Sequence, residues 1–189
     1  MSEVTERCRI YMAEVLRFAK VLNLTAIHDE NLFWRSFIEP SLALSKLAPV
    51  HGRLLDVGSG MGIPGIPILI ALPGLEGVLV ERRKKRSEFL RHVIRQLGLN
   101  ATVYDADINS LPSLQVDLCV ARAVAEEKLL LRMCTPHVRD NAVALLPVPK
   151  ESNPAAISGW SLEGIELIDE AGLQQKVHRY RFREVSRET

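Results

Sequence analysis

The stretch that decides the fold is RLLDVGSGMGIPGIP, which runs from Arg53 to Pro67. Its apolar start predicts a buried strand, and three alternate glycines then predict a tight turn that leads into a helix near Pro64. Glycine has no Cβ and tolerates positive φ, so such a turn lets the backbone approach a ligand closely. Gly62 makes the spacing G-x-G-x-G, whereas a dinucleotide fingerprint needs its third glycine where Ile63 stands. We therefore expect a nucleoside ligand without a pyrophosphate, of which S-adenosylmethionine is the common example.

Composition limits the classes of protein that fit. The 189 residues are 47% hydrophobic and carry a net charge of +1, which suits one domain with a sizeable core and a weak overall field. The cysteines Cys8, Cys119 and Cys134 lack C-x-x-C spacing, which argues against a zinc site or a disulfide framework. No apolar run reaches the roughly 20 residues of a membrane span, and the N-terminus lacks a signal-peptide core. We expect a cytoplasmic protein with no metal and no membrane association.

The first fifty residues are predicted to be helical. Apolar residues recur at three- and four-residue steps from Val4 to Leu22, which indicates a helix that ends near Asn23. A second helical segment is expected after Asp29, a good N-cap residue, until Pro40 breaks or kinks it. We interpret residues 1–50 as a helical cap on the main domain.

Residues 51–189 alternate between predicted strands and helices, which is typical of an α/β fold with a largely parallel sheet. The predicted strands are 53–58, 77–81, 101–104, 116–121, 142–146, 165–168 and 176–182, and the predicted helices are 64–72, 84–97 and 125–137. Residues 147–159 are expected to be a loop with at most one helical turn. Seven strands complete the Rossmann-like class I S-adenosylmethionine-dependent methyltransferase fold, which we predict for this part of the chain as one compact unit.

An acidic residue is predicted to hold the ribose of the ligand. Glu81 ends the second strand about 20 residues after the glycine turn, at the sheet edge where ligands of open α/β folds bind. Its carboxylate can accept hydrogen bonds from both ribose hydroxyls, and the alternative is an ion pair with Arg82 or Arg83. Asp107, after the third strand, is expected near the adenine, although it also suits an ordinary polar loop.

Arg122 is the third polar residue expected at this edge. It follows the apolar strand DLCVA, so its guanidinium emerges where the ligand is expected. It could bind the methionine carboxylate or an RNA phosphate in a bidentate manner. The alternative is a surface ion pair with Glu126 or Glu127.

Two basic groups favour RNA as a partner despite the near-neutral net charge. The first comprises Arg82, Arg83, Lys84, Lys85 and Arg86, beside the expected nucleoside site, where such side chains would neutralise phosphates. The second comprises His178, Arg179, Arg181 and Arg183 on the last strand, where alternation places the odd positions on one face. Solvated charged faces are the plainer interpretation of both groups.

Three segments together resemble the RsmG (GidB) family. They are LLDVGSGMGIPGIPILIA, then E-x-x-x-K-R-x-x-F-L from Glu81 to Leu90, and D-x-x-x-x-R-A from Asp117 to Ala123. The segment NLTAIHD from Asn23 to Asp29, with Arg35 and Glu39 after it, is also similar, so the resemblance covers residues 10–147. The GxGxGxPGIP core is more particular than a general methyltransferase glycine loop.

The resemblance implies an enzyme that uses S-adenosylmethionine to methylate N7 of a guanine in 16S ribosomal RNA. Its partner would be ribosomal RNA or the small ribosomal subunit, with no DNA expected and a monomeric state. By resemblance, Gly58, Ile63, Ala106, Asp107 and Arg122 match cofactor-contacting positions. With the residues argued above, the predicted cofactor-binding set is Asp56, Gly58, Ser59, Gly60, Gly62, Ile63, Glu81, Ala106, Asp107 and Arg122.

The chain also departs from the family pattern, as a divergent member would. Ser36 replaces a usual histidine, Asp105 a usual arginine, and Ala144 to Pro147 a usual A-L-K-G segment whose lysine is absent. Lys150, in the following loop, could reach the same region, so we add it to the RNA-binding candidates. The departures leave two alternatives open: a methyltransferase for another RNA or a small molecule, and a non-catalytic RNA- or ribosome-binding protein.

No residue is assigned a catalytic role. Guanine N7 carries a lone pair and no proton, so it needs no general base, and alignment of the reactants alone can contribute about 7–11 kcal/mol. The five histidines show neither ligand spacing nor a pairing with a nucleophile.

Overall fold

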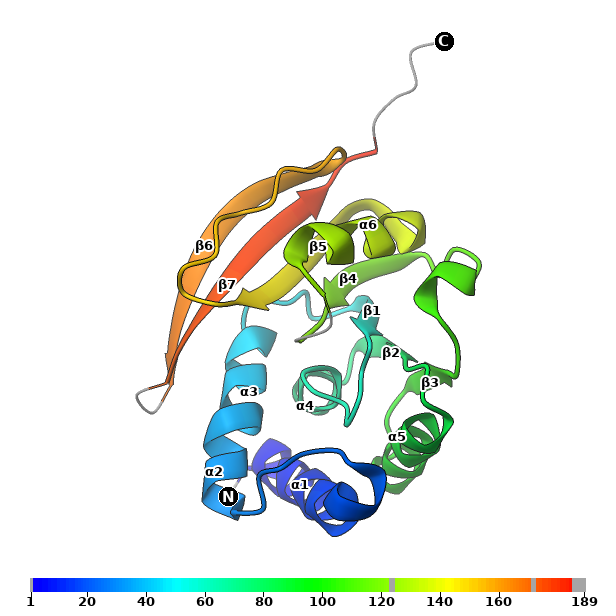
Figure 1. Cartoon of the computed structure of the whole chain (residues 1–189), viewed down its shortest axis with the longest axis vertical. Coiled ribbons are helices and arrows are strands. Elements are labelled where there is room, and N and C mark those ends of the chain that lie inside the picture. Colours follow the sequence, from blue (N-terminus) through cyan, green and yellow to red (C-terminus); the bar gives the residue numbers. More distant parts are fainter. Residues whose placement is uncertain (1, 123–124, 171–172, 185–189) are drawn as a thin grey trace.

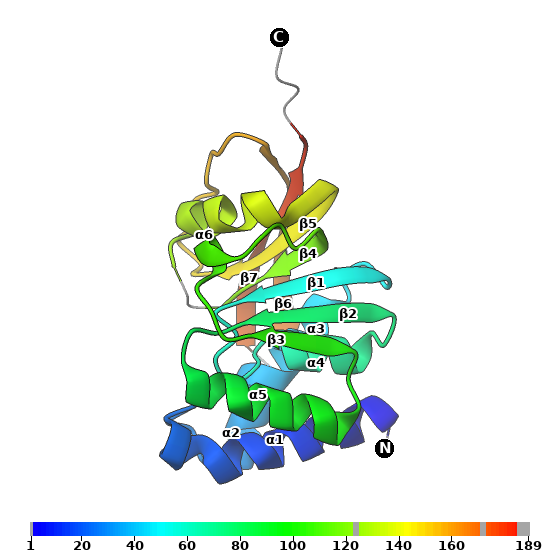
Figure 2. The same ribbon diagram turned by 90° about the vertical axis from the view of Figure 1, so that its right-hand side faces the viewer.

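A computed structural model describes residues 2–122, 125–170 and 173–184 of the chain. It contains a seven-stranded sheet in the order β3-β2-β1-β4-β5-β7-β6, with helices against both faces (Figures 1 and 2). The strands are β1 Gly52–Val57, β2 Leu75–Val80, β3 Ala101–Tyr104, β4 Val116–Val120, β5 Val138–Val148, β6 Trp160–Glu170 and β7 Leu173–Phe182. The seven predicted strands are confirmed, and β5 and β6 are much longer than predicted.

The sheet is parallel from β3 through β5, and β7 and β6 are antiparallel to their neighbours. The order reverses between β1 and β4, because β1 leads outward to β2 and β3 before the chain returns to β4. Such a reversal opens a crevice beyond the carboxyl ends of the two strands, where ligands bind in open α/β folds. The glycine turn follows β1 and therefore lies at this crevice.

Helices follow the predicted pattern with small shifts. They are α1 Glu3–Leu22, α2 Glu30–Phe33, α3 Glu39–Ser45, α4 Gly65–Ala71, α5 Lys84–Leu97 and α6 Glu127–Cys134, with a π-helical turn at Trp34–Ile38 and 3₁₀ turns at Ile108–Ser110 and Thr135–His137. Asp29 caps α2 by accepting from the Leu32 N–H at 2.7 Å, and Gly98 ends α5 in the left-handed conformation, as predicted. None of the described helices is long and apolar enough to cross a membrane.

Two expectations were wrong in detail. Pro40 does not break the second helical segment: α2, the π-helical turn and α3 follow one another without a gap from Glu30 to Ser45, although Pro40 has no N–H to donate. The residues before it widen into the π-helical turn instead. Residues 149–159 lie outside helices and long strands, as the expected loop does, but β5 continues through Pro147 to Val148 because both pair with β7.

The core has one cluster on each face of the sheet. Helices α1, α3, α4 and α5 contribute to the first, with buried strand residues such as Leu54 and Leu79, and α6 contributes to the second, with Leu55 and Val78. Neighbouring residues of β1 and β2 point to opposite faces, so these strands are buried on both sides. The N-terminal helices thus share a core with α4 and α5, and Tyr11 of α1 donates a hydrogen bond to the carbonyl of Met61 in the glycine turn at 2.9 Å.

Candidate functional site

The glycine turn is held open by its backbone. Gly58, Gly60 and Gly62 all have positive φ, at 65°, 58° and 102°. The Ser59 N–H donates to the carbonyl of Val80 at 3.0 Å, which ties the turn to the end of β2. The Ser59 hydroxyl donates to the carbonyl of Asp56 at 2.8 Å. The side of the turn away from these contacts faces a cavity.

Glu81 completes the link between the two strand ends. Its Oε2 accepts from the Gly60 N–H at 3.0 Å, and its Oε1 accepts from the Arg83 N–H at 2.8 Å. The side chain lines the cavity although the residue is only 7% exposed. Two carboxylate oxygens offer about four acceptor sites, so each keeps one for a ligand hydroxyl. The alternative of a side-chain ion pair with Arg82 or Arg83 is not what the structure shows, because Arg83 contributes its backbone.

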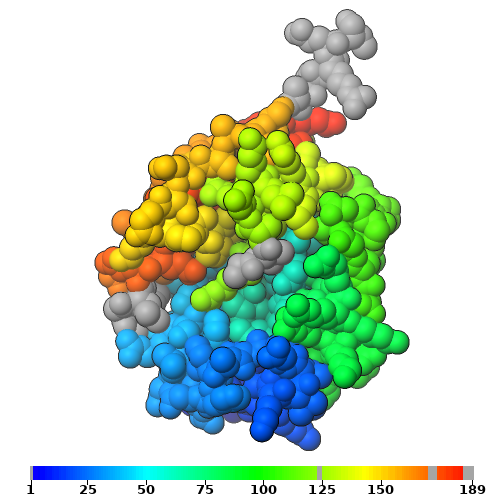
Figure 3. Space-filling view, viewed as in Figure 1, coloured from blue at the N-terminus to red at the C-terminus, as the bar shows by residue number. Residues whose placement is uncertain are grey.

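The cavity has a volume of about 740 Å³ and lies over the carboxyl ends of β1, β2 and β4. In Figure 3 the glycine-turn region (cyan) lies at the bottom of a hollow between the N-terminal helices (blue) and the segment after β2 (green). Eight of the ten predicted cofactor-binding residues line it: Gly58, Ser59, Gly60, Ile63, Glu81, Ala106, Asp107 and Arg122.

Asp56 and Gly62, the other two predicted residues, do not line the cavity. Asp56 is fully buried beneath the turn, where its Oδ2 accepts from the Gly65 N–H at 3.2 Å and its Oδ1 has no hydrogen-bond partner among the described residues. Burial raises the pKa of its carboxyl group to about 7. Both residues support the turn from the side away from the cavity.

Asp107 is at the opposite wall of the cavity. Its Oδ1 accepts from the Asn109 N–H at 2.9 Å, and this bond, with further contacts that include Arg82, lowers the pKa of the carboxyl group. The Arg82 guanidinium lies 3.5 Å from Oδ2. The residue is therefore both a loop cap, as the plainer interpretation expected, and a charged group in the cavity wall.

Arg122 reaches the cavity from the end of β4, but neither predicted partner holds it. Its Nη1 donates to the carbonyl of Ser36 at 3.0 Å, and the guanidinium lies 4.9 Å from the centre of the Phe37 ring. Pro40 has no N–H, so it cannot form the usual helical bond to that Ser36 carbonyl. Burial lowers the pKa of Arg122 from its ordinary value. The proline that the sequence suggested as a helix breaker instead helps to anchor this arginine.

Sequence reasoning missed the contribution of the N-terminal segment to the site. Leu24, Thr25 and Phe37 line the cavity together with the residues of the sheet edge. Phe37 lies in the helical segment expected after Asp29, where nothing local in the sequence distinguishes a core position from a cavity wall. Ala123, part of the family-like motif, lies outside the described residues.

Only some residues of the first basic group line the cavity. Arg82, Arg83 and Arg86 line the cavity, and Arg86 also donates to the carbonyl of Asn23. Lys84 and Lys85 begin α5, are exposed and do not line it. Lys150 lies elsewhere and donates to Gln174 Oε1 at 2.9 Å.

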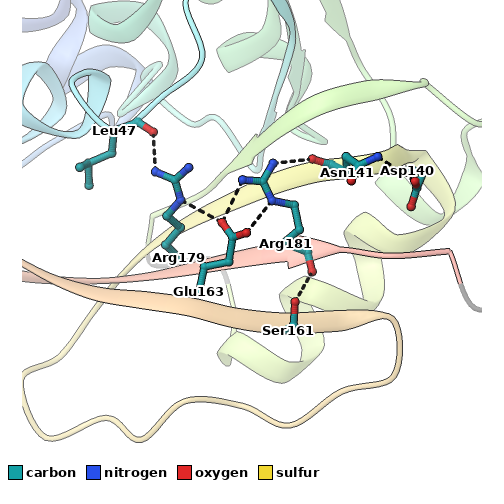
Figure 4. A network of polar contacts seen from close by, with 7 residues as sticks. All are labelled: Leu47, Asp140, Asn141, Ser161, Glu163, Arg179 and Arg181. Carbon is teal, nitrogen blue, oxygen red and sulfur yellow. Dashed lines mark hydrogen bonds and ion pairs between the residues drawn. The ribbon is translucent and has the colours of Figure 1, made fainter.

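The second basic group is largely engaged within the protein (Figure 4). Glu163 of β6 pairs with Arg179 at 3.2 Å and with Arg181 at 2.8 Å. Arg179 also donates to the carbonyl of Leu47, which joins β7 to the end of α3. His178 is fully buried on the opposite face. We therefore interpret this group as a brace for the antiparallel edge of the sheet.

Comparison with known proteins identifies the family. A sequence profile described as "GidB: rRNA small subunit methyltransferase G" matches residues 4–149. The chain belongs to this family. Among its relatives, the ribosomal RNA small subunit methyltransferase G of Stenotrophomonas maltophilia (strain K279a) is 33% identical over 173 residues, covering 89% of this chain and 81% of the relative. The protein of the same name from Cereibacter sphaeroides (strain ATCC 17023) is 34% identical over 169 residues, covering 85% and 82%.

Solved structures support the fold of this GidB-family chain. Pyrococcus horikoshii TYW2, solved in complex with MeSAdo, aligns with a TM-score of 0.63 at 16% identity, covering 79% of this chain and 64% of that one. The putative methyltransferase yhhF from Escherichia coli aligns with a TM-score of 0.61 at 15% identity, covering 77% and 85%. The predicted Rossmann-like methyltransferase fold and the predicted family are both confirmed.

Proposed function

We propose that this protein transfers the methyl group of S-adenosylmethionine to N7 of a guanine in the 16S ribosomal RNA of the small subunit. The observation that carries this proposal is the 740 Å³ cavity in which Glu81 bridges the glycine turn and the end of β2. Membership of a family described as rRNA small subunit methyltransferase G supports the choice of substrate.

The residues present suit this cofactor. Glu81 keeps acceptor capacity for two ribose hydroxyls, beside backbone that approaches closely because Gly58 and Gly60 have no side chains. Asp107 and Ala106 would face the adenine. Arg122, whose guanidinium is fixed by Ser36 and Phe37, would bind the methionine carboxylate. The fixed guanidinium loses little further side-chain entropy on binding.

The chemistry asks for alignment and not for proton transfer. S-adenosylmethionine supplies an electrophilic methyl group on a sulfonium sulfur. The N7 lone pair forms the new nitrogen–carbon bond while the sulfur–carbon bond breaks and its electron pair goes to sulfur, and no proton moves. The described lining of the cavity contains no histidine or cysteine, which is consistent with this mechanism. What the residues contribute is a fixed distance and direction between the two reactants.

Exposed basic residues at the cavity mouth would hold the RNA backbone. Arg82, Arg83, Lys84 and Lys85 are exposed around the start of α5, beside the cavity. Arg86 and the more distant Lys150 would contribute a weaker attraction, since both already donate to protein acceptors. Binding through such residues weakens as the salt concentration rises, because counterion release drives it.

The direct test measures transfer of labelled methyl groups from S-adenosylmethionine. We expect label in undermodified small subunits or naked 16S RNA, mapped to guanine N7, and none in transfer RNA. A Gly60→Asp variant should lose activity, because the new side chain would extend from the turn into the cavity and its carboxylate would repel that of Glu81. Label in transfer RNA alone would point to another RNA substrate, and RNA binding without any transfer would point to a non-catalytic protein.

A Glu81→Gln variant should bind S-adenosylmethionine about 10- to 100-fold more weakly. The neutral amide loses one acceptor oxygen and the charge that strengthens bonds to ribose hydroxyls, a loss of about 1.5–3 kcal/mol. Isothermal titration calorimetry measures this affinity. Glu76→Gln is the matched control, because Glu76 lies on β2, the strand that leads into Glu81, but pairs with Arg53 at 3.0 Å, away from the cavity. If both variants bind S-adenosylmethionine equally tightly, Glu81 does not hold the cofactor.

A further inference from the structure

A second cavity adjoins the proposed cofactor site. It has a volume of about 680 Å³ and lies between the start of α6 and the end of β5. Arg122 and Ala125 line both cavities, so the two share a wall. Apolar residues that include Leu130, Leu146 and Pro149 form much of its lining. A largely apolar cavity of this size with a few polar groups is typical of small-molecule sites.

The carboxylate of Glu127, which lines this cavity, is held by hydrogen bonds from several residues. Glu127 Oε1 accepts from the Tyr180 hydroxyl and from the Ala155 N–H, the latter at 3.2 Å. The His178 ring nitrogen Nδ1 donates to the same carboxylate, 3.1 Å from Oε1 and 2.9 Å from Oε2. Tyr180 and His178 are both fully buried, and burial together with Glu127 raises the pKa of Tyr180. The charge of Glu127 is therefore fixed in one position.

The fixed carboxylate keeps one open acceptor. Among the residues that the structure describes, Oε1 receives three contacts, whereas Oε2 receives only the bond that it shares with Oε1 from His178. Glu127 is among the residues that line the cavity, and its side chain is 10% exposed. A buried carboxylate oxygen with spare acceptor capacity selects a ligand that presents an N–H group.

We infer that this second cavity holds the target guanine and that Glu127 Oε2 accepts a hydrogen bond from the N1–H of its Watson–Crick edge. The inference rests on the proposed function and deepens it. N7 lies on the Hoogsteen edge of guanine and N1–H on the adjacent Watson–Crick edge, so a guanine placed where the two cavities meet, beside Arg122 and Ala125, can turn N7 towards the methyl group and N1–H into the second cavity. Adenine and cytosine present a ring-nitrogen acceptor at the corresponding place, which a carboxylate repels.

The same bond would assist methyl transfer. Positive charge develops on the purine as N7 is methylated, which makes N1–H a stronger donor. A bond from N1–H to a carboxylate therefore strengthens between the ground state and the transition state, which is the condition for raising kcat as well as affinity. Glu127 is a base-reading residue in this scheme, and Tyr180 and His178 are positioning residues that act through it.

The experiment compares base binding and methyl transfer in the full-length protein. Guanosine 5′-monophosphate, adenosine 5′-monophosphate and 1-methylguanosine 5′-monophosphate are titrated into the protein saturated with S-adenosylhomocysteine, and binding is followed by NMR. We expect the wild type to bind the guanosine nucleotide at least 10-fold more tightly than the other two. Glu127→Gln should lose this preference, and its kcat for RNA methylation should fall at least 10-fold while its affinity for the cofactor product stays within 2-fold.

A control variant and separate readouts distinguish failure of this inference from failure of the proposed function. Glu151→Gln removes an exposed carboxylate from the neighbouring loop that does not line the cavity, and it should behave like the wild type. Equal wild-type binding of guanosine and 1-methylguanosine nucleotides, undetectable binding of the guanosine nucleotide, or unchanged kcat in Glu127→Gln would overturn the inference. A Glu127-dependent preference for guanine without methylation of any ribosomal RNA would support it and refute the proposed function. The wild-type comparison needs no variant, so a misfolded Glu127→Gln protein does not weaken the test.

Discussion

A Gly62→Ala variant should be less stable than the wild type by about 3–5 kcal/mol. A Cβ at this position would lie 2.5 Å from Ile66 Cγ1 and 3.2 Å from Leu90 Cδ2, and both side chains are fully buried and cannot move aside. The backbone φ of +102° also lies outside the conformations that alanine adopts at low cost. Overpacking and backbone strain each cost about 1–3 kcal/mol. Urea unfolding followed by circular dichroism measures the loss.

The control for this prediction is Gly98→Ala, at the end of α5. Gly98 also has positive φ, at +58°, but a Cβ there would meet no atom within 4 Å. Its cost should be only about 1 kcal/mol, since the left-handed conformation alone is penalised. If the two variants lose equal stability, backbone strain and not packing explains why Gly62 is needed. The difference therefore measures how tightly the turn is packed onto α4 and α5.

The stability of the protein should decrease as pH rises from about 4 to 7, because of Asp56. Its carboxyl group ionises near 3.8 in the unfolded chain and at about 7 in the folded protein, where it is fully buried. Between these values the folded state holds a proton that the unfolded state has lost, so raising the pH favours unfolding. The full effect is about 4 kcal/mol. Above pH 7 and below pH 4 this group contributes no further change.

An Asp56→Asn variant tests the assignment. Asparagine keeps an oxygen that can accept from the Gly65 N–H but does not titrate. Between pH 5 and pH 8 the wild type should lose about 3 kcal/mol more stability than the variant, measured by urea unfolding at both values. Parallel pH profiles would show that Asp56 is ionised in the folded protein throughout this range.

Sequence patterns were reliable where the signal is local. The strand at Ala101–Tyr104 and the helix at Lys84–Leu97 begin and end where predicted, since short apolar runs, a charged start and Gly98 define them. The extent of β5 and β6 was underestimated, because their outer residues gain partners from other strands: Val138 pairs with Val116 of β4, and Val148 and the outer residues of β6 pair with β7. Tertiary pairing stabilises strand residues that have no strong preference of their own.

The amino-acid sequence was enough to predict the glycine turn, the positions of Glu81 and Arg122 at one sheet edge, and the family. Each depends on spacing along the chain, which fixes backbone conformation and the face of a strand. The folded structure was needed to show that Ser36 and Phe37 hold Arg122, and that Tyr180 and His178 hold Glu127 beside a second cavity. These partners are 86, 53 and 51 residues apart for Arg122–Ser36, Tyr180–Glu127 and His178–Glu127. No local pattern encodes contacts of that range, because packing of whole helices and strands brings them together.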